Sequence, residues 1–270
     1  MSIHATAVID PKARLGCNVT VGPFAVIAAE VEIGDDSVIG PHVTILPYTT
    51  LGKACRVHAG AVLGDLPQDL AFKNETSYVR IGNGVTIREG VTIHRGTKAG
   101  TVTEVGDGCF LMAQAHLAHN VRLASHVILV GGVLLAGYVE VGERAILSGH
   151  VVVHQFVRIG RLAMIGGAAA VGKDVPPFCM VGAMTVNRVA GLNVIGMRRA
   201  GLPPDQRKAV KAAFGALYRS GLNVSQAIEK IKAVAEAGSP AAEIATLVEA
   251  SKRGICGYGA DEDGEAPAED

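Results

Sequence analysis

Three residues that could take part in acyl transfer lie 18 positions apart in the chain: His119, Gly137 and Gln155. A neutral imidazole can accept the proton of an attacking hydroxyl, because its pKa lies near 7. A glycine N–H can stabilise the negative oxygen of a tetrahedral intermediate. His116 and His154 lie close to this set in the chain. These residues predict acyl-transfer chemistry, provided that the fold stacks positions that are 18 residues apart.

A six-residue period in the sequence supplies this stacking. Between Ile3 and Val171, 26 of the 29 positions taken every sixth residue are Ile, Leu or Val, and the exceptions are Asp69, Glu75 and Ala99. The residue two places before each aliphatic is nearly always small or β-branched, and the residue after it is often glycine. We expect the aliphatics to point inward, the small residues to fill the corners, and glycine to allow tight bends.

This period fits neither an α-helix nor a simple alternating strand. It fits three short flat strands that make one triangular coil of 18 residues, with each coil hydrogen-bonded to the next. The sequence therefore predicts an all-β, left-handed parallel β-helix made of hexapeptide repeats, followed by a small C-terminal α-helical domain.

The β-helix is expected to span residues 1–177 and to carry two loops where the repeat fails, at 65–78 and 97–104. Long loops on a regular scaffold are commonly functional. Pro176 and Pro177 are expected to end the ladder, because proline has no N–H to donate.

A non-repeat connector is predicted over 178–202, the helical domain over 203–254, and a disordered acidic tail over 255–270. The three helices of the domain are predicted at about 203–219, 224–237 and 240–252.

The composition excludes several classes of protein. Lys and Arg together number 25, as do Asp and Glu, so no net field favours nucleic acid or a membrane surface. Five cysteines without a C-x-x-C spacing favour neither a disulfide framework nor a cysteine-rich zinc site, and they suit a reducing compartment. The N-terminus has no signal-peptide pattern, and the longest uncharged run, Leu123 to Val139, is too short to span a membrane as a helix. We expect a cytoplasmic protein.

The outward positions of the repeat are rich in Val, Ala and Leu, most densely over 127–153. Such faces predict burial in an oligomer. Three prisms around one axis suit a triangular cross-section, so we expect a homotrimer with its sites between neighbouring subunits.

Seven stretches resemble the UDP-N-acetylglucosamine O-acyltransferases, a family of cytoplasmic enzymes that begin lipid A synthesis. They are PQDLAFKNE, IREGVTIHRGT, AHLAHN, LLAGYV, VVVHQFVRIG, KDVPPF and GLNVIGMRRAGL. The resemblance covers nearly the whole chain. It implies transfer of a 3-hydroxyacyl chain from acyl carrier protein to the 3-hydroxyl of UDP-N-acetylglucosamine, without a cofactor or a metal.

The resemblance also implies a role for individual residues. His119 would be the general base, Gly137 would supply the oxyanion N–H, and Gly167 lies near the position that limits acyl-chain length. Asn193 and Arg199 would hold the uridine diphosphate, and a guanidinium suits phosphate by its fork of donors. The other substrate-binding positions are Asp69, Lys73, His116, Tyr138, His154 and Gln155.

Three positions depart from the family pattern. Lys is common where this chain has Ala71, with Lys73 two residues later. His is usual at Tyr138, and Asp is usual at Asn120 beside the expected base. An Asn can orient an imidazole but cannot offset the charge of an imidazolium. These departures indicate a divergent relative whose sugar or acyl group could differ.

Two alternatives remain open on the sequence. One is a related N- or O-acyltransferase that uses another nucleotide sugar, or acetyl-coenzyme A as the donor. The other is a non-catalytic scaffold or a metal enzyme, in which His94, His116, His119 and His154 would bind zinc.

Overall fold

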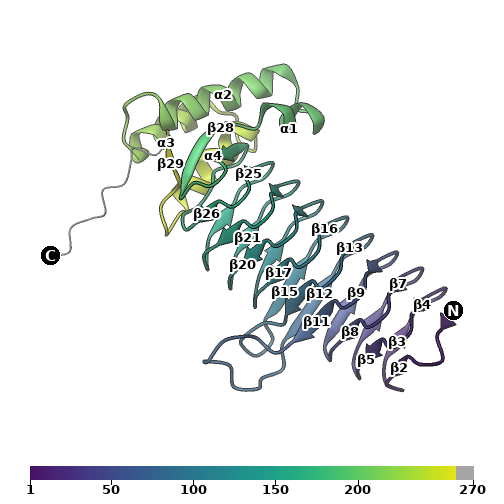
Figure 1. Ribbon diagram of the computed structural model, residues 1–270. Helices are drawn as coiled ribbons and strands as arrows, with labels where there is room; N and C mark the ends of the chain where they lie inside the picture. Colours follow the sequence, from purple (N-terminus) through teal and green to yellow (C-terminus); the bar gives the residue numbers. More distant parts are fainter. Residues whose placement is uncertain (260–270) are drawn as a thin grey trace.

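The computed structural model describes residues 1–259 of the chain, and Figure 1 shows a long stack of triangular coils that ends in a cap of helices. Strands pair in parallel with those of the next coil, as when Ser2 and Ile3 lie beside Thr20 and Val21. The coils form three sheets, here named A, B and C. The predicted hexapeptide β-helix with a helical domain after it is confirmed.

From β1 to β26 every third strand belongs to the same sheet, and β27, β28 and β29 all join the end of sheet A. Sheet A contains β1 (Ser2–Ile3), β4 (Thr20–Val21), β7 (Val38–Ile39), β10 (Arg56–Val57), β13 (Thr86–Ile87), β16 (Phe110–Leu111), β19 (Ile128–Leu129), β22 (Ile146–Leu147), β25 (Met164–Ile165), β27 (Cys179–Val181), β28 (Arg188–Leu192) and β29 (Gly257–Tyr258). Sheet B contains β2 (Val8–Ile9), β5 (Val26–Ile27), β8 (Thr44–Ile45), β11 (Val62–Asp65), β14 (Thr92–His94), β17 (His116–Leu117), β20 (Leu134–Leu135), β23 (Val152–Val153) and β26 (Ala170–Val171). Sheet C contains β3 (Arg14–Leu15), β6 (Glu32–Ile33), β9 (Thr49–Leu51), β12 (Tyr78–Ile81), β15 (Val102–Val105), β18 (Arg122–Leu123), β21 (Glu140–Val141) and β24 (Arg158–Ile159).

The core of the prism is filled by the periodic aliphatic and by the residue two places before it. Val19 and Val21, for example, are both buried, and the same pair recurs in the coils above. The first coil has no coil beneath it, so Ile3 remains 46% exposed. Stability is therefore built layer by layer along the stack.

The prediction that the glycines after the aliphatics form the tight bends is wrong. The bends fall at other residues, such as Asn18, Phe24 and Glu30, whose φ angles are near +58°. Glycine is required for a different reason: a Cβ on Gly34 would lie 2.6 Å from the carbonyl carbon of Gly52 in the next coil. Close stacking of the corners, not backbone freedom, explains these glycines.

The prediction that Pro176 and Pro177 end the ladder is wrong. Val175 still bridges to Ile159, and β27 pairs in parallel with β25 after the prolines. The two prolines occupy the turn between these pairings, where no ladder N–H is needed. The β-helix therefore continues by one further strand of sheet A.

The predicted connector 178–202 contains regular structure. Strand β28 turns back antiparallel to β27, and α1 (Val194–Arg199) follows it. The remaining helices are α2 (Pro204–Tyr218), α3 (Val224–Val234) and α4 (Pro240–Glu249).

The helical domain is anchored on the last coils of the prism. Arg158 donates to the Leu247 carbonyl of α4 at 3.0 Å, and Arg161 pairs with Glu243 of the same helix at 2.8 Å. Disorder was expected from residue 255 onward, but residues 255–259 are ordered, because β29 pairs with β28 and the Tyr218 hydroxyl donates to the Cys256 carbonyl. The rest of the expected tail, 260–270, lies outside the described residues. None of the helices described is both long and apolar enough to cross a bilayer.

Candidate functional site

His119 lies two residues after β17, at the corner where the chain passes from sheet B to sheet C. The coils stack here as predicted: Tyr138 N–H donates to the His119 carbonyl, and Phe156 N–H donates to the Gly137 carbonyl, each at 3.0 Å. The imidazole lies outside the aliphatic core, over Gly137, where a Cβ would come within 2.4 Å of His119 Cε1. Only a residue without a side chain fits beneath this ring.

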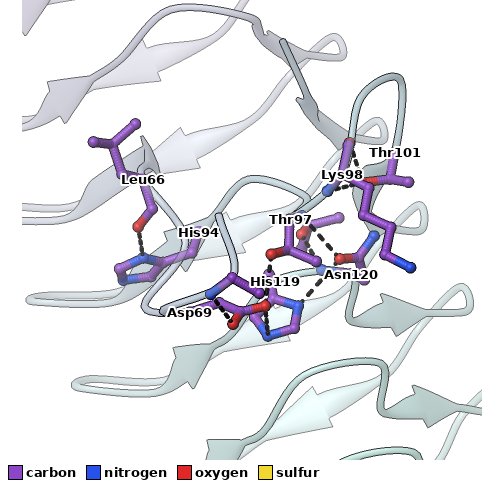
Figure 2. Close-up of polar contacts among 10 residues, drawn as sticks. Leu66, Asp69, His94, Thr97, Lys98, Thr101, His119 and Asn120 are labelled. Carbon is purple, nitrogen blue, oxygen red and sulfur yellow. Dashed lines mark hydrogen bonds and ion pairs between the residues drawn. The ribbon is translucent and has the colours of Figure 1, made fainter. Parts of the chain in front are cut away.

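The hydrogen bonds of Asn120 fix the tautomer of His119. Asn120 Oδ1 accepts the Thr97 N–H at 3.0 Å, which identifies this atom as the amide oxygen. The same oxygen lies 3.1 Å from His119 Nδ1, so Nδ1 carries the proton and donates it to Asn120. Nε2 is left with its lone pair free, and it points toward Asp69 (Figure 2).

Asp69 reaches the imidazole from the loop between β11 and β12. Its Oδ2 lies 3.8 Å from His119 Nε2, too far for a hydrogen bond. Hydrogen bonds from the Thr97 hydroxyl at 2.7 Å and the Ala71 N–H at 2.9 Å hold the pKa of Asp69 below its usual range. A carboxylate therefore faces the basic nitrogen across a narrow gap.

The two loops predicted from the failed repeat lie against one another beside this site. Ala99 N–H donates to Glu75, and Gly100 N–H donates to the Thr76 carbonyl. The buried Arg95 guanidinium lies 5.5 Å from the ring of Phe72 in the first loop. Sequence reasoning assigned no role to Thr97 or Arg95, although both lie in the IHRGT motif.

His116 lies on the outer face of sheet B, next to two other polar groups. Its Nδ1 is 2.7 Å from the Thr92 hydroxyl, and its ring meets that of His94 edge-on at 5.1 Å. Burial lowers the pKa of His116, and His94 lowers it further. His94 in turn bonds to the Leu66 carbonyl through its Nδ1, which ties the first loop to this face.

An aromatic column extends the site from His119 along the coils that follow it. The Tyr138 ring meets the imidazole edge-on at 5.3 Å, and it stacks on Phe156 at 4.9 Å. Burial raises the pKa of Tyr138, with a smaller effect from Asp69. Tyr138 therefore stands next to His119 as a neutral hydroxyl.

His154 and Gln155 complete the predicted column, but both are exposed. The His154 ring is 3.2 Å from the Gln155 carbonyl. Lys73 is exposed as well, and no hydrogen bond or ion pair joins it to another residue in the described part of the chain.

Asn193 and Arg199 lie away from His119 within one chain. They line a groove of about 820 Å³ on the outer face of sheet A, whose floor includes Phe110, Ile128 and Met164. Asn193 is buried and caps α1: its Oδ1 accepts the Gly196 N–H and its Nδ2 donates to the Leu162 carbonyl. The Arg199 side chain is exposed.

Gly167 lies at the corner between sheets A and B, at the end of a stacked column with Gly131 and Gly149. A Cβ on Gly167 would make only ordinary contacts, with the Gly149 carbonyl oxygen at 3.5 Å and Ser148 Cβ at 4.0 Å. The corner is therefore a smooth strip without side chains. The zinc alternative has no matching cluster, since within residues 1–259 no three His, Cys, Asp or Glu side chains converge on one point.

Two family models match parts of this chain. Residues 174–256 match a family model described as UDP N-acetylglucosamine O-acyltransferase, domain 2, and residues 12–47 and 30–65 match the bacterial transferase hexapeptide repeat. The acyl-[acyl-carrier-protein]--UDP-N-acetylglucosamine O-acyltransferase of Thermodesulfovibrio yellowstonii is 41% identical over 94% of this chain and 98% of its own length. The enzyme of the same name from Paraburkholderia phytofirmans is 43% identical over 94% and 98%.

Solved structures of the same kind share the fold. The crystal structure of Francisella novicida UDP-N-acetylglucosamine acyltransferase superimposes with a TM-score of 0.91 at 38% identity, over 97% of this chain and 95% of that one. The Arabidopsis enzyme gives a TM-score of 0.80 at 32% identity, over 94% and 99%. Identity at this level over almost the whole length shows that the chain belongs to the UDP-N-acetylglucosamine O-acyltransferase family.

Proposed function

We propose that this protein transfers a 3-hydroxyacyl chain from acyl carrier protein to the 3-hydroxyl of UDP-N-acetylglucosamine, the reaction that begins lipid A synthesis. The names of its relatives support the reaction class and both substrates. The observation that carries the proposal is the pairing of a free His119 Nε2 with the Gly137 backbone beneath it.

In the proposed mechanism His119 is the general base. Nε2 accepts the proton of the sugar hydroxyl as its oxygen attacks the thioester carbonyl. The carbon–sulfur bond then breaks, the acyl ester remains on the sugar, and the imidazolium returns the proton to the leaving thiolate. The Asn120 amide holds Nδ1–H throughout, so the ring keeps the orientation that the reaction needs.

Gly137 is proposed to stabilise the oxyanion of the tetrahedral intermediate. Its N–H makes no hydrogen bond to any residue described, so it is available to a substrate oxygen. A side chain here would collide with the imidazole, which supports glycine as a requirement of the site.

The remaining site residues are proposed to bind substrate. Asp69, as a carboxylate, accepts hydrogen bonds from the sugar and offsets the charge of the imidazolium that forms 3.8 Å away. His116, Tyr138, His154, Gln155 and Lys73 are proposed to contact the nucleotide sugar, and Asn193 and Arg199 the uridine diphosphate. The strip that ends at Gly167 is proposed as a wall of the acyl-chain groove.

A homotrimer would complete this site, and the outer faces of the prism support one. Sheet A presents Phe110, Ile128, Ile146 and Met164 outward, and sheet B presents Leu134 and Val152. Sheet C presents an alternating ladder of charges in which each residue lies beside the next: Arg80, Glu104, Arg122, Glu140 and Arg158. We propose that sheet A of one copy packs on sheet B of the next, leaving sheet C in solvent.

This arrangement brings separated residues together. It places the A–B corner of each copy near the threefold axis, and it joins the sheet A groove of one copy to the B–C corner of its neighbour. Arg199 of one copy would then face His119 of the next. Neither residue needs to move, because each already lies on the surface that the contact would cover.

The proposal is tested by mass spectrometry of products formed from UDP-N-acetylglucosamine and a mixture of 3-hydroxyacyl carrier proteins. We expect an ester of one favoured chain length. His119→Ala should reduce the rate at least about 100-fold while circular dichroism stays unchanged. Absence of any acylated sugar nucleotide would contradict the proposed activity. Transfer only from acetyl-coenzyme A would support the alternative donor instead.

A further inference from the structure

Thr97 makes two hydrogen bonds, and their acceptors lie on opposite sides of the His119 ring. Its N–H donates to Asn120 Oδ1 at 3.0 Å, and its hydroxyl donates to Asp69 Oδ2 at 2.7 Å (Figure 2). Asn120 contacts the proton-bearing Nδ1 of the imidazole, and Asp69 faces the free Nε2. One buried residue therefore holds both polar groups that flank the imidazole.

The chain that follows Thr97 is folded into a tight turn. Gly96 lies against Thr101, since a Cβ on Gly96 would come within 2.7 Å of the Thr101 carbonyl carbon. The Thr101 hydroxyl donates to the Lys98 carbonyl at 2.7 Å, and the Thr101 N–H donates to the same oxygen at 3.0 Å. This closed turn fixes the backbone on both sides of Thr97, whose side chain points toward Asp69.

The direction of one carboxylate oxygen of Asp69 depends on Thr97. Oδ1 accepts the Ala71 N–H within its own loop at 2.9 Å, whereas the Thr97 hydroxyl is the one hydrogen-bond donor to Oδ2 among residues 1–259. The hydrogen bond from Thr97, and then that from Ala71, lowers the pKa of Asp69 and keeps it anionic. Without the Thr97 hydroxyl, Oδ2 would be an unpaired anionic oxygen that faces His119 Nε2.

A gap separates this oxygen from the imidazole. The distance of 3.8 Å between Asp69 Oδ2 and His119 Nε2 is about 1 Å longer than a charge-assisted hydrogen bond. The side chains of Asp69 and His119 are only 27% and 12% exposed, so solvent screens their attraction weakly. A carboxylate that closed the gap would occupy Nε2 and stabilise the protonated ring. Because a protonated imidazole cannot accept a proton from a hydroxyl, a base at this position needs the gap.

Two other titratable side chains face this pair. Lys98, from the second loop, adds a small lowering of the pKa of Asp69. Tyr138, from the next coil, meets the imidazole edge-on, and burial raises its pKa. One is a cation and the other a neutral hydroxyl, so neither can replace Asp69 as the negative charge next to Nε2.

We propose that Thr97 is a positioning residue that keeps the Asp69 carboxylate from bonding to His119 Nε2. This inference rests on the proposed function, in which Nε2 receives the proton of the sugar hydroxyl. Thr97 holds Asp69 close enough to offset the charge of the imidazolium that forms during the reaction. It also holds Asp69 far enough away to leave Nε2 of the resting enzyme open to the substrate.

The test compares the pH profiles of kcat/KM for UDP-N-acetylglucosamine in the full-length protein. Thr97→Val keeps the backbone N–H and the branched shape but removes the hydroxyl. The rise of its activity with pH should move upward by about one pH unit, because a direct ion pair stabilises the protonated imidazole. The loss should therefore be about tenfold on the acid side of the profile and small on the alkaline side. Thr97→Ser should restore the wild-type profile.

Two controls separate this role from a general loosening of the loop. Thr101→Val removes a hydroxyl from the same loop that bonds to Lys98 and not to Asp69, and it should leave the profile at the wild-type pH. In an Asp69→Asn background no carboxylate can close the gap, so the addition of Thr97→Val should move the profile no further. NMR titration of the His119 ring in isotope-labelled protein, assigned with His119→Ala, should show the same pattern without substrate.

Two results would overturn the role of Thr97 while leaving the proposed function intact. One is an equal loss of activity at every pH in Thr97→Val, and the other is the same movement of the profile in the Asp69→Asn background. If the wild-type protein acylated nothing, the proposed function would fail, and the NMR titration would decide the role of Thr97 separately. A His119 titration that Thr97→Val moves and Thr97→Ser does not would support it, and a titration that neither variant moves would refute it.

Discussion

At the scale of single residues, we expect Asn120 to set how His119 behaves as the proposed base. Its amide oxygen receives both Thr97 N–H and His119 Nδ1–H. An aspartate here would accept the same bonds and stabilise the protonated imidazole. In Asn120→Asp we therefore expect the rise of kcat/KM with pH to shift to higher pH. Asn120→Ala should instead lose activity about tenfold or more, because the ring can then turn or adopt the other tautomer. A pH profile that is identical in Asn120→Asp and wild type would contradict this role.

His116 makes a second prediction at this scale, for stability. Its pKa is lowered from the ordinary value of 6.5 by burial and by His94. The unfolded chain therefore binds a proton at His116 more readily than the folded chain does. The stabilisation from burying the neutral ring is complete above pH 6.5, and it is lost as the pH falls through the pKa of His116 in the folded protein. In thermal unfolding, the Tm of the wild-type protein should fall as the pH drops below 6.5. The Tm of His116→Gln should fall less over the same range. His4→Gln, at an exposed position, should follow the wild-type curve.

The site could be predicted from sequence only where the repeat fixes it. The 18-residue period alone predicts that His119 and Gly137 stack in adjacent coils, and the structure agrees. The approach of Asp69 to His119 could not be derived from spacing, since loop residues follow no period, and the family resemblance gave Asp69 only a substrate-binding role. Thr97 was missed for the same reason: its contacts with Asp69 and Asn120 join residues 23 or more positions apart.

At the scale of elements, the loop that carries Asp69 is clamped by Arg95. The guanidinium is buried between the rings of Tyr48 and Phe72, 5.5 Å from each centre.

Arg95→Leu removes both cation–π contacts, each worth about 1 kcal/mol, and frees the loop. We expect KM for the sugar nucleotide to rise about tenfold, because Asp69 must be ordered on binding. Limited proteolysis should show faster cleavage within the loop between β11 and β12. Arg95→Lys keeps the charge but cannot stack a planar group on the rings. Its KM and cleavage rate should lie between those of the wild-type protein and Arg95→Leu. Cleavage at the wild-type rate in Arg95→Leu would contradict the clamp.

Elements outside the period were the harder ones to foresee. The failure of the repeat located both loops, and helical patterns located three helices. In the structure, Asn223 caps α3 with a capping box. Helix α1 has only six residues and includes Gly196, so no pattern distinguishes it. Strands β28 and β29 depend on pairing between residues 188 and 257, which local sequence does not encode.

At the scale of the whole molecule, sheet C carries charges on its outer face, whereas sheets A and B carry apolar residues. A protein that works as a monomer would not need this difference. An inert scaffold could carry charges on every face, yet only sheet C has the alternating ladder from Arg80 to Arg158. The apolar faces A and B carry, at their outer corners, the two halves of the candidate site. A trimer would bury these faces and unite the halves, whereas a monomer would leave Arg199 and His119 apart.

Intersubunit complementation tests this arrangement. His119→Ala and Arg199→Ala should each be nearly inactive alone, because every interface lacks one half. Mixed trimers formed by co-expression contain interfaces with His119 from one copy and Arg199 from the other. Random assembly of equal amounts should restore about a quarter of the wild-type activity.

Sedimentation should give three times the chain mass of 27.8 kDa for all three samples. A double variant that carries both changes in one chain serves as the control, since mixing it with either single variant yields no complete interface. Trimers that show no recovery would place both residues in the same subunit's site and contradict the contact between sheets A and B.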